Sequence, residues 1–345
     1  MKIYLFIVIT LIFFGSIVFA SDYYIDARNG NDSKNGLSKA NAWQTWDKLR
    51  VQTYTIGDTI SFKCGEQWDI PYNNYWTFDD SGTVNNYIEI TSYGTGPKPI
   101  WNAVESISGS WSDKGWNIWK RKLNGRVERC ILGDIESVEA DNVEDIDGIS
   151  KYWYGDDSCL YVYSKSNPDI VYSQVKVVRI GWCILFQNAN YVKLNNIELR
   201  GGSVDTIRLR NNCSYISIEN CIITYSGKSG IMGMVEEGSG NTLTNVVIKN
   251  NFISGEQDLV NKTIRGINED GISMWRACSD WHIIGNTIKN YSHSGISIQT
   301  YTSSESGSNN NIIEDNTFTA GNSPYFRAFD FHGPEGKCMR IFLCI

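Results

Sequence analysis

The chain has 345 residues, of which 41% are hydrophobic and 13% aromatic, so it carries enough apolar surface for a folded core. This composition excludes a disordered chain and a collagen-like fibre. With 31 Lys and Arg against 38 Asp and Glu, the net charge is −7, which argues against a nucleic-acid binder that relies on bulk positive charge.

Residues 1–20 have the pattern of a secretory signal peptide. Lys2 precedes a long apolar run, and Val18 and Ala20 stand at the small-residue positions before a cleavage point. We expect cleavage between Ala20 and Ser21 and a protein that is secreted, periplasmic or held at the cell surface. A retained membrane anchor is the alternative, because an apolar run of about 18 residues can span a bilayer. After cleavage we expect a monomer that contacts neither membrane nor nucleic acid.

The nine cysteines are scattered, and none forms a Cys-x-x-Cys pair. The three histidines, His282, His293 and His332, lie far from the cysteines in sequence, so no cysteine–histidine zinc spacing is present. Buried free thiols are therefore favoured over a disulfide framework.

Two short motifs alternate along the second half of the chain. The first is an Asn-containing step before a hydrophobic residue, and it begins at Asn195, Asn220, Asn250, Asn286 and Asn316. The second has a central hydrophobic residue after a small or polar pair, and it occupies residues 205–209, 229–233, 270–274 and 294–298. Each unit holds short stretches of alternating polarity, rich in Ile, Val and Thr, between Gly, Asn and Ser turns. This pattern predicts two short strands per unit without a connecting helix.

Short parallel strands that recur at this spacing predict an all-β solenoid, the parallel β-helix. One coil cannot bury its own inward face, so successive coils must stack to form a continuous core. The Asn residues of the first motif are expected to form a ladder of side-chain amides at a tight turn, because Asn satisfies backbone groups there and tolerates left-handed geometry.

The N-terminal half carries segments that resemble a known family. Residues 23–32 are similar to the opening of many secreted right-handed parallel β-helix proteins of the pectate-lyase-like superfamily. Residues 57–62 and 88–94 resemble their first coils, and residues 153–163 resemble a hairpin that often interrupts the helix. The resemblance covers about residues 22–332 and implies a right-handed parallel β-helix with an N-terminal cap and a hairpin insertion. It implies little about activity, because this family holds lyases, hydrolases, epimerases and non-catalytic proteins.

We therefore expect a single β-helix domain over residues 21–332. Its parts are a cap and first coils, the insertion, and the regular coils, at residues 21–101, 102–175 and 176–332. Residues 333–345 lack turn spacing and a capping element, which predicts a truncated or frameshifted end.

Equivalent positions of successive coils lie above one another, about 4.8 Å apart. Aligning the second motif therefore predicts a polar column of Asp205, Ser229, Asp270 and Ser294. The preceding residues form a second column of Val204, Lys228, Glu269 and His293. Ile207, Ile231, Ile272 and Ile296 are expected to point inward. Alternation then directs two more columns outward: Arg208, Met232, Ser273 and Ser297, and Arg210, Met234, Trp275 and Gln299.

Residues 255–268 are a second source of candidate residues. They form a loop about ten residues longer than its equivalents on other coils, and loops that rise from a rigid scaffold often carry binding residues. We expect this loop, with Arg265, to form a wall beside the polar columns. Together with these columns it suits an extended acidic sugar polymer, for which the predicted substrate-binding residues are Arg210, Trp275, Gln299, Lys228 and Arg265.

Three functions fit this polar face, and the sequence leaves all three open. In β-elimination, cations neutralise a uronate carboxylate and a base removes the neighbouring proton. The predicted calcium ligands are Asp270, Glu269 and Asp205, and the candidate bases are His293, Lys228 and Arg208.

In hydrolysis, two carboxylates flank the scissile bond, and Asp205 and Asp270 are expected about 9.6 Å apart, two coils from one another. Residues 268–271 and His293 partly resemble segments of β-helical polygalacturonases, whose paired aspartates are missing here. The third alternative is a non-catalytic glycan-binding protein. A polysaccharide lyase is the leading hypothesis.

Overall fold

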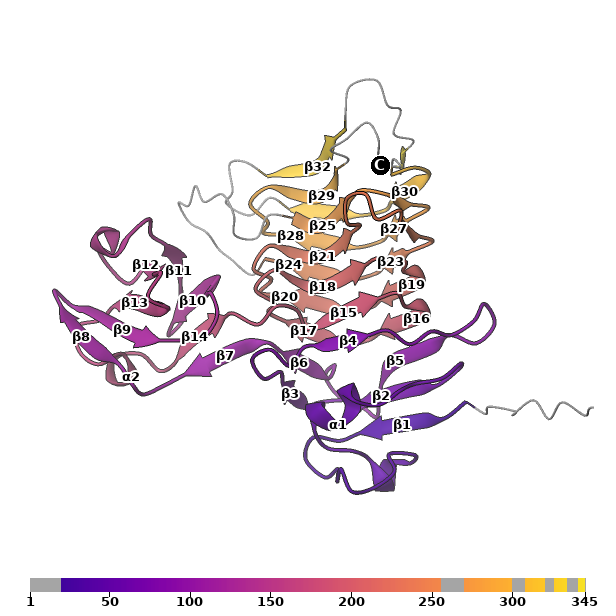
Figure 1. Cartoon of the computed structure of the whole chain (residues 1–345), viewed down its shortest axis with the longest axis horizontal. Helices are drawn as coiled ribbons and strands as arrows, with labels where there is room; N and C mark the ends of the chain where they lie inside the picture. Colours follow the sequence, from indigo (N-terminus) through magenta and orange to yellow (C-terminus); the bar gives the residue numbers. More distant parts are fainter. Residues whose placement is uncertain (1–19, 256–269, 300–307, 320–325, 334–340, 345) are drawn as a thin grey trace, which may run out of the picture.

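A computed structural model describes residues 20–255, 270–299, 308–319 and 326–333, together with the backbone of residues 341–344. The regular coils form a right-handed parallel β-helix, whose stacked strands are seen in Figure 1. Each coil contributes one strand to each of three parallel sheets, as in β16 (Asn190–Asn195), β17 (Glu198–Arg200) and β18 (Asp205–Arg210). The predicted all-β solenoid is confirmed.

The sheet that contains β18, called the site sheet, carries the second sequence motif. Its strands pair in parallel from one coil to the next. They are β4 (Trp76–Phe78), β15 (Ile184–Gln187), β18, β21 (Ser229–Met234), β25 (Asp270–Trp275), β29 (Ser294–Gln299) and β32 (Arg327–His332).

The other two sheets complete the coils. The sheet of shorter strands holds β3 (Gln67–Asp69), β6 (Ile100–Asn102), β17, β20 (Ile222–Thr224), β24 (Phe252–Ser254), β28 (Thr287–Lys289) and β31 (Thr317–Thr319). The third sheet holds β1 (Asp22–Ile25), β2 (Thr59–Lys63), β5 (Ile88–Tyr93), β16, β19 (Ser214–Glu219), β22 (Leu243–Thr244), β23 (Val247–Lys249), β26 (Cys278–Ser279), β27 (His282–Ile284), β30 (Asn311–Glu314) and β33 (Ile341–Cys344). Residues 341–344, expected to lie outside the regular coils, thus pair as β33 with β30.

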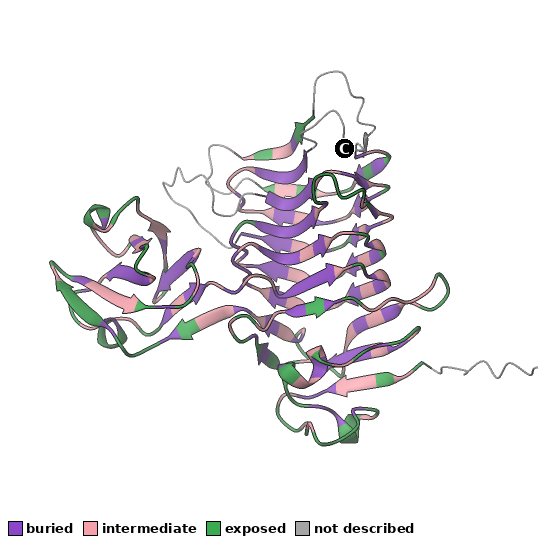
Figure 2. Cartoon of the chain, in the orientation of Figure 1, coloured by how far each residue is buried: buried purple, intermediate pink, exposed green. Residues whose placement is uncertain are grey.

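The core lies between the sheets, where the inward side chains of successive coils pack on one another. Figure 2 shows buried residues along the strands of the stacked coils. The four isoleucines predicted to point inward are fully buried: Ile207, Ile231, Ile272 and Ile296. Beside them, a Cβ on Gly271 would lie 2.3 Å from Ile288 Cγ2 and 2.6 Å from the carbonyl oxygen of Gly295. A glycine therefore follows Asp270 because the next coils leave no space for a side chain.

The asparagine ladder exists and includes Asn286 and Asn316 as predicted, with Asn251 in place of Asn250. Asn251, Asn286 and Asn316 form it: the Oδ1 of each later residue accepts hydrogen bonds from the backbone N–H and the Nδ2 of the one before it, all at 2.9–3.0 Å. Asn220 and Asn250 instead precede the ladder position and adopt positive φ. Asn250 was predicted where Asn251 stands in the ladder, because Asn suits both neighbouring positions of this turn. Asn220 Nδ2 donates instead to Asn195 Oδ1 at 2.9 Å.

The predicted hairpin insertion is a larger structure, an antiparallel-rich sheet beside the stack (Figure 1). Its strands are β7 (Val104–Ile107), β8 (Ser112–Gly115), β9 (Ile118–Lys122), β10 (Arg129–Leu132), β11 (Ile135–Glu139), β12 (Lys151–Tyr154), β13 (Cys159–Tyr163) and β14 (Val175–Val178). It has its own core, in which Tyr152, Leu160 and Val162 are among the buried side chains. The helices are short: α1 (Trp46–Arg50), α2 (Pro168–Val171) and the 3-10 turns η1 (Lys39–Asn41) and η2 (Val143–Asp145).

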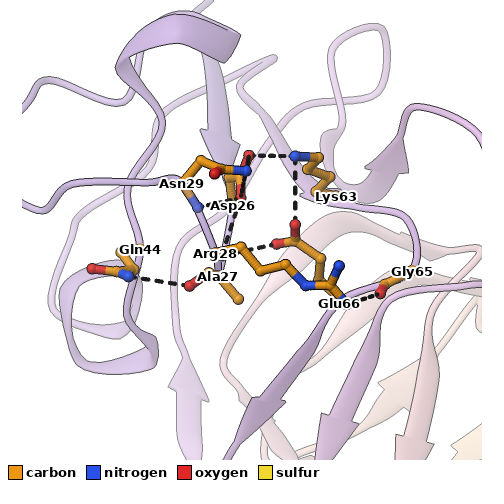
Figure 3. Close-up of polar contacts among 8 residues, drawn as sticks. All are labelled: Asp26, Ala27, Arg28, Asn29, Gln44, Lys63, Gly65 and Glu66. Carbon is orange, nitrogen blue, oxygen red and sulfur yellow. Dashed lines mark hydrogen bonds and ion pairs between the residues drawn. The ribbon is translucent and has the colours of Figure 1, made fainter.

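Charged residues of the N-terminal segment fasten the first coils together, as Figure 3 shows. Asp26 Oδ1 accepts hydrogen bonds from the backbone N–H groups of Arg28 and Asn29 at 3.1 and 2.8 Å, and Lys63 Nζ binds Asp26 Oδ2 at 2.6 Å and Glu66 at 3.4 Å. Asp26 and Glu66 are buried and engaged in these contacts. The charged residues of segment 23–32, which resembles the opening of other β-helix proteins, therefore have a structural role.

The cysteines of the described residues are unpaired, and all of these except Cys64 are buried, as expected for structural thiols. A search of the described part of the chain finds no helix that is both long and apolar enough to cross a membrane. The predicted signal peptide, residues 1–20, lies outside the described residues except for Ala20.

Candidate functional site

The strand register places the predicted polar residues level with one another. Asp205 pairs with Ser229, Ser229 with Asp270, and Asp270 with Ser294, so the predicted column is confirmed. One more coil follows, because Ser294 pairs with Arg327 of β32. Within the described residues, Arg327 is therefore the last member of the polar column of the site sheet.

Five residues at this end form a connected group, called the histidine cluster: Asp270, His293, Arg327, Asp330 and His332. His293 Nδ1 lies 2.9 Å from Asp270 Oδ1, and His293 Nε2 lies 3.4 Å from Asp330 Oδ2. His332 Nε2 is 2.8 Å from the same Asp330 Oδ2, and Arg327 Nη1 is 2.8 Å from Asp330 Oδ1. One imidazole thus bridges two carboxylates from different coils.

The carboxylates of the cluster are buried, whereas its imidazoles and its guanidinium are partly or largely exposed. Side-chain exposure is 4% for Asp270 and 5% for Asp330, against 38% for His293, 56% for His332 and 60% for Arg327. The hydrogen bond to Asp270 and the charges of both aspartates raise the pKa of His293, against the opposing effect of partial burial. A ligand from solvent meets the imidazoles and the guanidinium first.

Two coils below, Asp205 and Arg208 form a second polar group on the site sheet. The Asp205 side chain has no exposure and pairs with Arg208 Nη2 at 2.7 Å. The Arg208 guanidinium lies over the Trp182 ring, 5.2 Å from its centroid. Asp205 is predicted to act directly on a substrate; in the structure it is fully buried, and its carboxylate contacts Arg208.

Burial also changes the ionisation of Asp205. It raises the pKa of this carboxyl from 3.8 to about 6, because the loss of hydration outweighs the favourable charge of Arg208. Between these two pH values the folded chain keeps a proton that the unfolded chain has released, so folding stability is lost as the pH rises through this range.

We expect Asp205→Asn to remove this pH dependence. A shift of about two pKa units corresponds to roughly 3 kcal/mol, so the stability of the variant relative to the parent chain should rise by about that amount from pH 4 to pH 7. Urea unfolding followed by circular dichroism at each pH measures the difference, in which the other titrating groups cancel. Parallel pH profiles for the two chains would show that Asp205 does not titrate here.

The remaining predicted residues have different surroundings. Arg210 forms an ion pair with Glu236, and Lys228 is exposed in the turn before β21. Trp275 is half-buried in register with Gln299, which is buried and donates to Ser297 Oγ at 2.7 Å. Glu269, Arg265 and the rest of the predicted loop after Gly255 lie outside the described residues.

The outward columns are less exposed than alternation predicts. Met232, Ser273, Ser297 and Gln299 all have exposures of 7% or less. Strand alternation gives the side of the sheet on which a side chain lies, and it does not say what covers that side. The exposed part of the face is therefore narrower than predicted and centres on the histidine cluster.

Sequence reasoning missed three members of this cluster, Arg327, Asp330 and His332. They lie in register with Ser294, Ser297 and Gln299, one coil beyond the last aligned motif. The signal was present, because residues 327–332 alternate as the earlier motifs do. Their sequence lacks the Gly-Ile step by which those motifs were aligned.

The predicted calcium ligands do not form one group among the described residues. Asp205 pairs with Arg208, and Asp270 Oδ1 already accepts hydrogen bonds from Ser294 Oγ at 2.5 Å and His293 Nδ1 at 2.9 Å. The residues that the structure describes do offer another group of three, His293, Asp330 and His332, with one ligand atom each, all within 4.8 Å of one another.

This arrangement can be compared with known proteins. The family described as "Right handed beta helix region" matches residues 158–332, which is half of the chain and includes the site sheet from β15 to β32. The chain belongs to the right-handed β-helix family. Among curated proteins, none matches it.

Two solved structures of this β-helix type illustrate the likeness. A structure of XylC in complex with xylose is 15% identical, with a TM-score of 0.59 over 87% of this chain. The pectate lyase Pel9A is 13% identical, with a TM-score of 0.51 over 94% of this chain. The β-helix chain spans 62% and 58% of the lengths of these two proteins, and at such identities the likeness is one of fold alone.

Proposed function

We propose that this β-helix protein acts on an extracellular acidic polysaccharide and cleaves it by β-elimination at the histidine cluster. The observation that carries the proposal is the difference in burial between the nitrogen-bearing groups and the carboxylates of the cluster. Imidazoles and a guanidinium face the solvent, and the two aspartates lie behind them with exposures of 4% and 5%. Elimination needs a base and cations at the substrate, whereas hydrolysis needs two carboxylates that reach the glycosidic bond.

His293 is the base in this proposal. Asp270 Oδ1 accepts a hydrogen bond from His293 Nδ1–H and so fixes the ring and its tautomer, which leaves Nε2 for proton transfer. Nε2 takes the C5 proton of a uronate, the electron pair forms the C4–C5 double bond, and the C4–O4 bond breaks with a proton from solvent passing to O4. A raised pKa makes the neutral imidazole a stronger base for this step.

Arg327 supplies a cation in the proposal, and His332 contacts the same Asp330 carboxylate. Both are more than half exposed and lie on β32 beside His293. A guanidinium binds a carboxylate in two parallel hydrogen bonds, so Arg327 is suited to hold the uronate group whose neutralisation acidifies C5–H. Further along the site sheet, Arg208 on Trp182 offers a second cation and an aromatic ring to the same polymer.

The similar structures support a carbohydrate as the substrate class. One similar structure is named as a pectate lyase and another was solved with xylose, so sugar ligands are natural candidates for this scaffold. Calcium takes no step in the proposed reaction, because the ligands predicted for it are engaged elsewhere or lie outside the described residues.

The test is to incubate the chain from Ser21 with pectic, alginate and glycosaminoglycan polymers, with calcium and then with a chelator. Absorbance of unsaturated products and reducing ends are recorded together. We expect both signals to rise with one polymer class and to persist with the chelator. Reducing ends without absorbance would identify a hydrolase and overturn the elimination. Binding without either signal would identify a glycan-binding protein.

A further inference from the structure

We propose that His293, Asp330 and His332 form a binding site for a divalent transition metal, of which Zn²⁺ is the type. The three side chains come from two neighbouring coils and converge at the outer face of the site sheet. Their ligand atoms lie within 4.8 Å of one another. The proposal rests on these three residues and is independent of the proposed reaction.

The distances between the ligand atoms suit a metal ion. Two atoms bound to zinc at about 2.0–2.1 Å with tetrahedral angles lie about 3.4 Å apart. His293 Nε2 is 3.4 Å from Asp330 Oδ2, and His332 Nε2 is 2.8 Å from the same oxygen. His332 is more than half exposed, so its ring can turn toward a metal ion with little loss of packing.

Neighbouring groups already orient the ligands. Asp270 Oδ1 lies 2.9 Å from His293 Nδ1, which fixes that nitrogen as the protonated one and directs Nε2 to the site. A carboxylate on the far nitrogen is the usual support of a metal-bound histidine. Arg327 occupies Asp330 Oδ1 at 2.8 Å, so only Oδ2 is left to face the two imidazoles.

The state of Asp330 Oδ2 independently favours a cation at this site. This oxygen is buried, and its geometry satisfies no hydrogen bond from the residues that the structure describes. Two imidazole nitrogens face it at 3.4 and 2.8 Å. A buried carboxylate oxygen without a hydrogen bond is costly, and a cation shared with both nitrogens removes that cost.

The donor set selects the kind of metal. Two imidazole nitrogens and one carboxylate oxygen are typical ligands of Zn²⁺ and other late first-row ions. Ca²⁺ and Mg²⁺ take oxygen ligands almost alone, so they should not compete. Three protein ligands also leave a fourth position of a tetrahedral ion open to water or to an acidic ligand.

Calorimetric titration of the untagged chain from Ser21 with ZnCl₂ tests the site. We expect one zinc ion per chain at micromolar or tighter dissociation constant, and no heat with CaCl₂. His332→Gln should weaken binding at least about 100-fold because a ligand is lost. Asp270→Asn should weaken it by about 10- to 100-fold, since it removes the support of His293 but no ligand.

His282→Gln is the matched control. His282 has the same exposure as His293, 38%, and also faces one carboxylate, with Nε2 2.6 Å from Glu314 Oε1. The group of three ligands does not include it. Unchanged zinc binding in this variant, with loss in His332→Gln, supports the site. Equal losses in both variants, or no loss in either, would overturn it.

An X-ray absorption spectrum of the zinc-loaded chain separates this site from the buried thiols. Nitrogen and oxygen neighbours at about 2.0 Å are expected, and sulfur neighbours at about 2.3 Å would place the ion on cysteine and overturn the proposal. Zinc on Nε2 would also prevent proton transfer there, so zinc should inhibit the proposed elimination. That last effect rests on the proposed function: zinc binding without inhibition would keep the site and reject His293 as the base.

Discussion

Replacing His293 with glutamine is expected to lower kcat/KM for elimination by roughly 1000-fold, because a positioned general base contributes about 100- to 10,000-fold. The amide of glutamine can keep a hydrogen bond to Asp270 but takes no proton. Initial rates of absorbance increase on the active polymer measure the loss. Because the missing group acts in the chemical step, kcat should fall while KM changes little.

Two further variants make this result specific. His282→Gln removes a histidine of equal exposure from another face of the stack and should keep full activity. Asp270→Asn should lower kcat by an intermediate factor, because Asp270 orients the base without touching the substrate. A folded His293→Gln chain with a third or more of the parent activity would place the base elsewhere, for instance at Lys228.

The position of His293 relative to Asp270 was predictable from the sequence, because residues at equivalent positions of successive coils lie next to one another in a solenoid. The repeated Gly-Ile step fixed which residues share a column, and the observed pairs of Asp270 with Ser294 and of Ile272 with Ile296 confirm it. The inward isoleucines are fully buried for the same reason. Where the repeat is regular, a single alignment therefore gives both fold and register.

Sequence patterns are weaker guides wherever one residue type suits two neighbouring positions or where burial depends on distant segments. Asn250 and Asn251 both fit the turn, and only the contacts with Asn286 show which one enters the ladder. Ser297 points outward by alternation, yet it has no exposure. Asp330 and His332 followed no recognised motif, so their approach to His293 became visible only in three dimensions.

The insertion is a further feature whose docking could not be foreseen from a local pattern. Arg129 of β10 reaches from the insertion to the stack, where Nη1 donates to the Ser226 carbonyl at 3.0 Å and Nη2 to the Gly255 carbonyl at 2.8 Å. The same guanidinium pairs with Glu136, with Nη2 2.7 Å from Oε2. Ser226 and Gly255 lie 97 and 126 residues from Arg129 along the chain, too far for any local sequence pattern to reveal these contacts.

Arg129→Met is therefore expected to lower the free energy of unfolding by about 3–5 kcal/mol, the usual effect of removing one partner of a buried ion pair. The Arg129 side chain has no exposure and Glu136 only 13%, so the variant leaves a carboxylate and two carbonyl groups without their donor. Urea unfolding followed by circular dichroism measures the loss. Adding Glu136→Gln to the variant should recover part of it, because the uncompensated charge is removed.

Arg126→Met is the control that shows whether the stability loss depends on the burial of the arginine or only on its charge. Arg126 also pairs with glutamates of the insertion, Glu128 at 2.9 Å and Glu139 at 2.5 Å, but its side chain is 54% exposed. Exposed ion pairs contribute about 0–1 kcal/mol, so this variant should unfold at nearly the parent urea concentration. Equal losses for Arg126→Met and Arg129→Met would mean that the insertion is held by general charge attraction. A loss confined to Arg129→Met would mean that one buried guanidinium joins the insertion to the turn leading into β21, the strand beside Asp270.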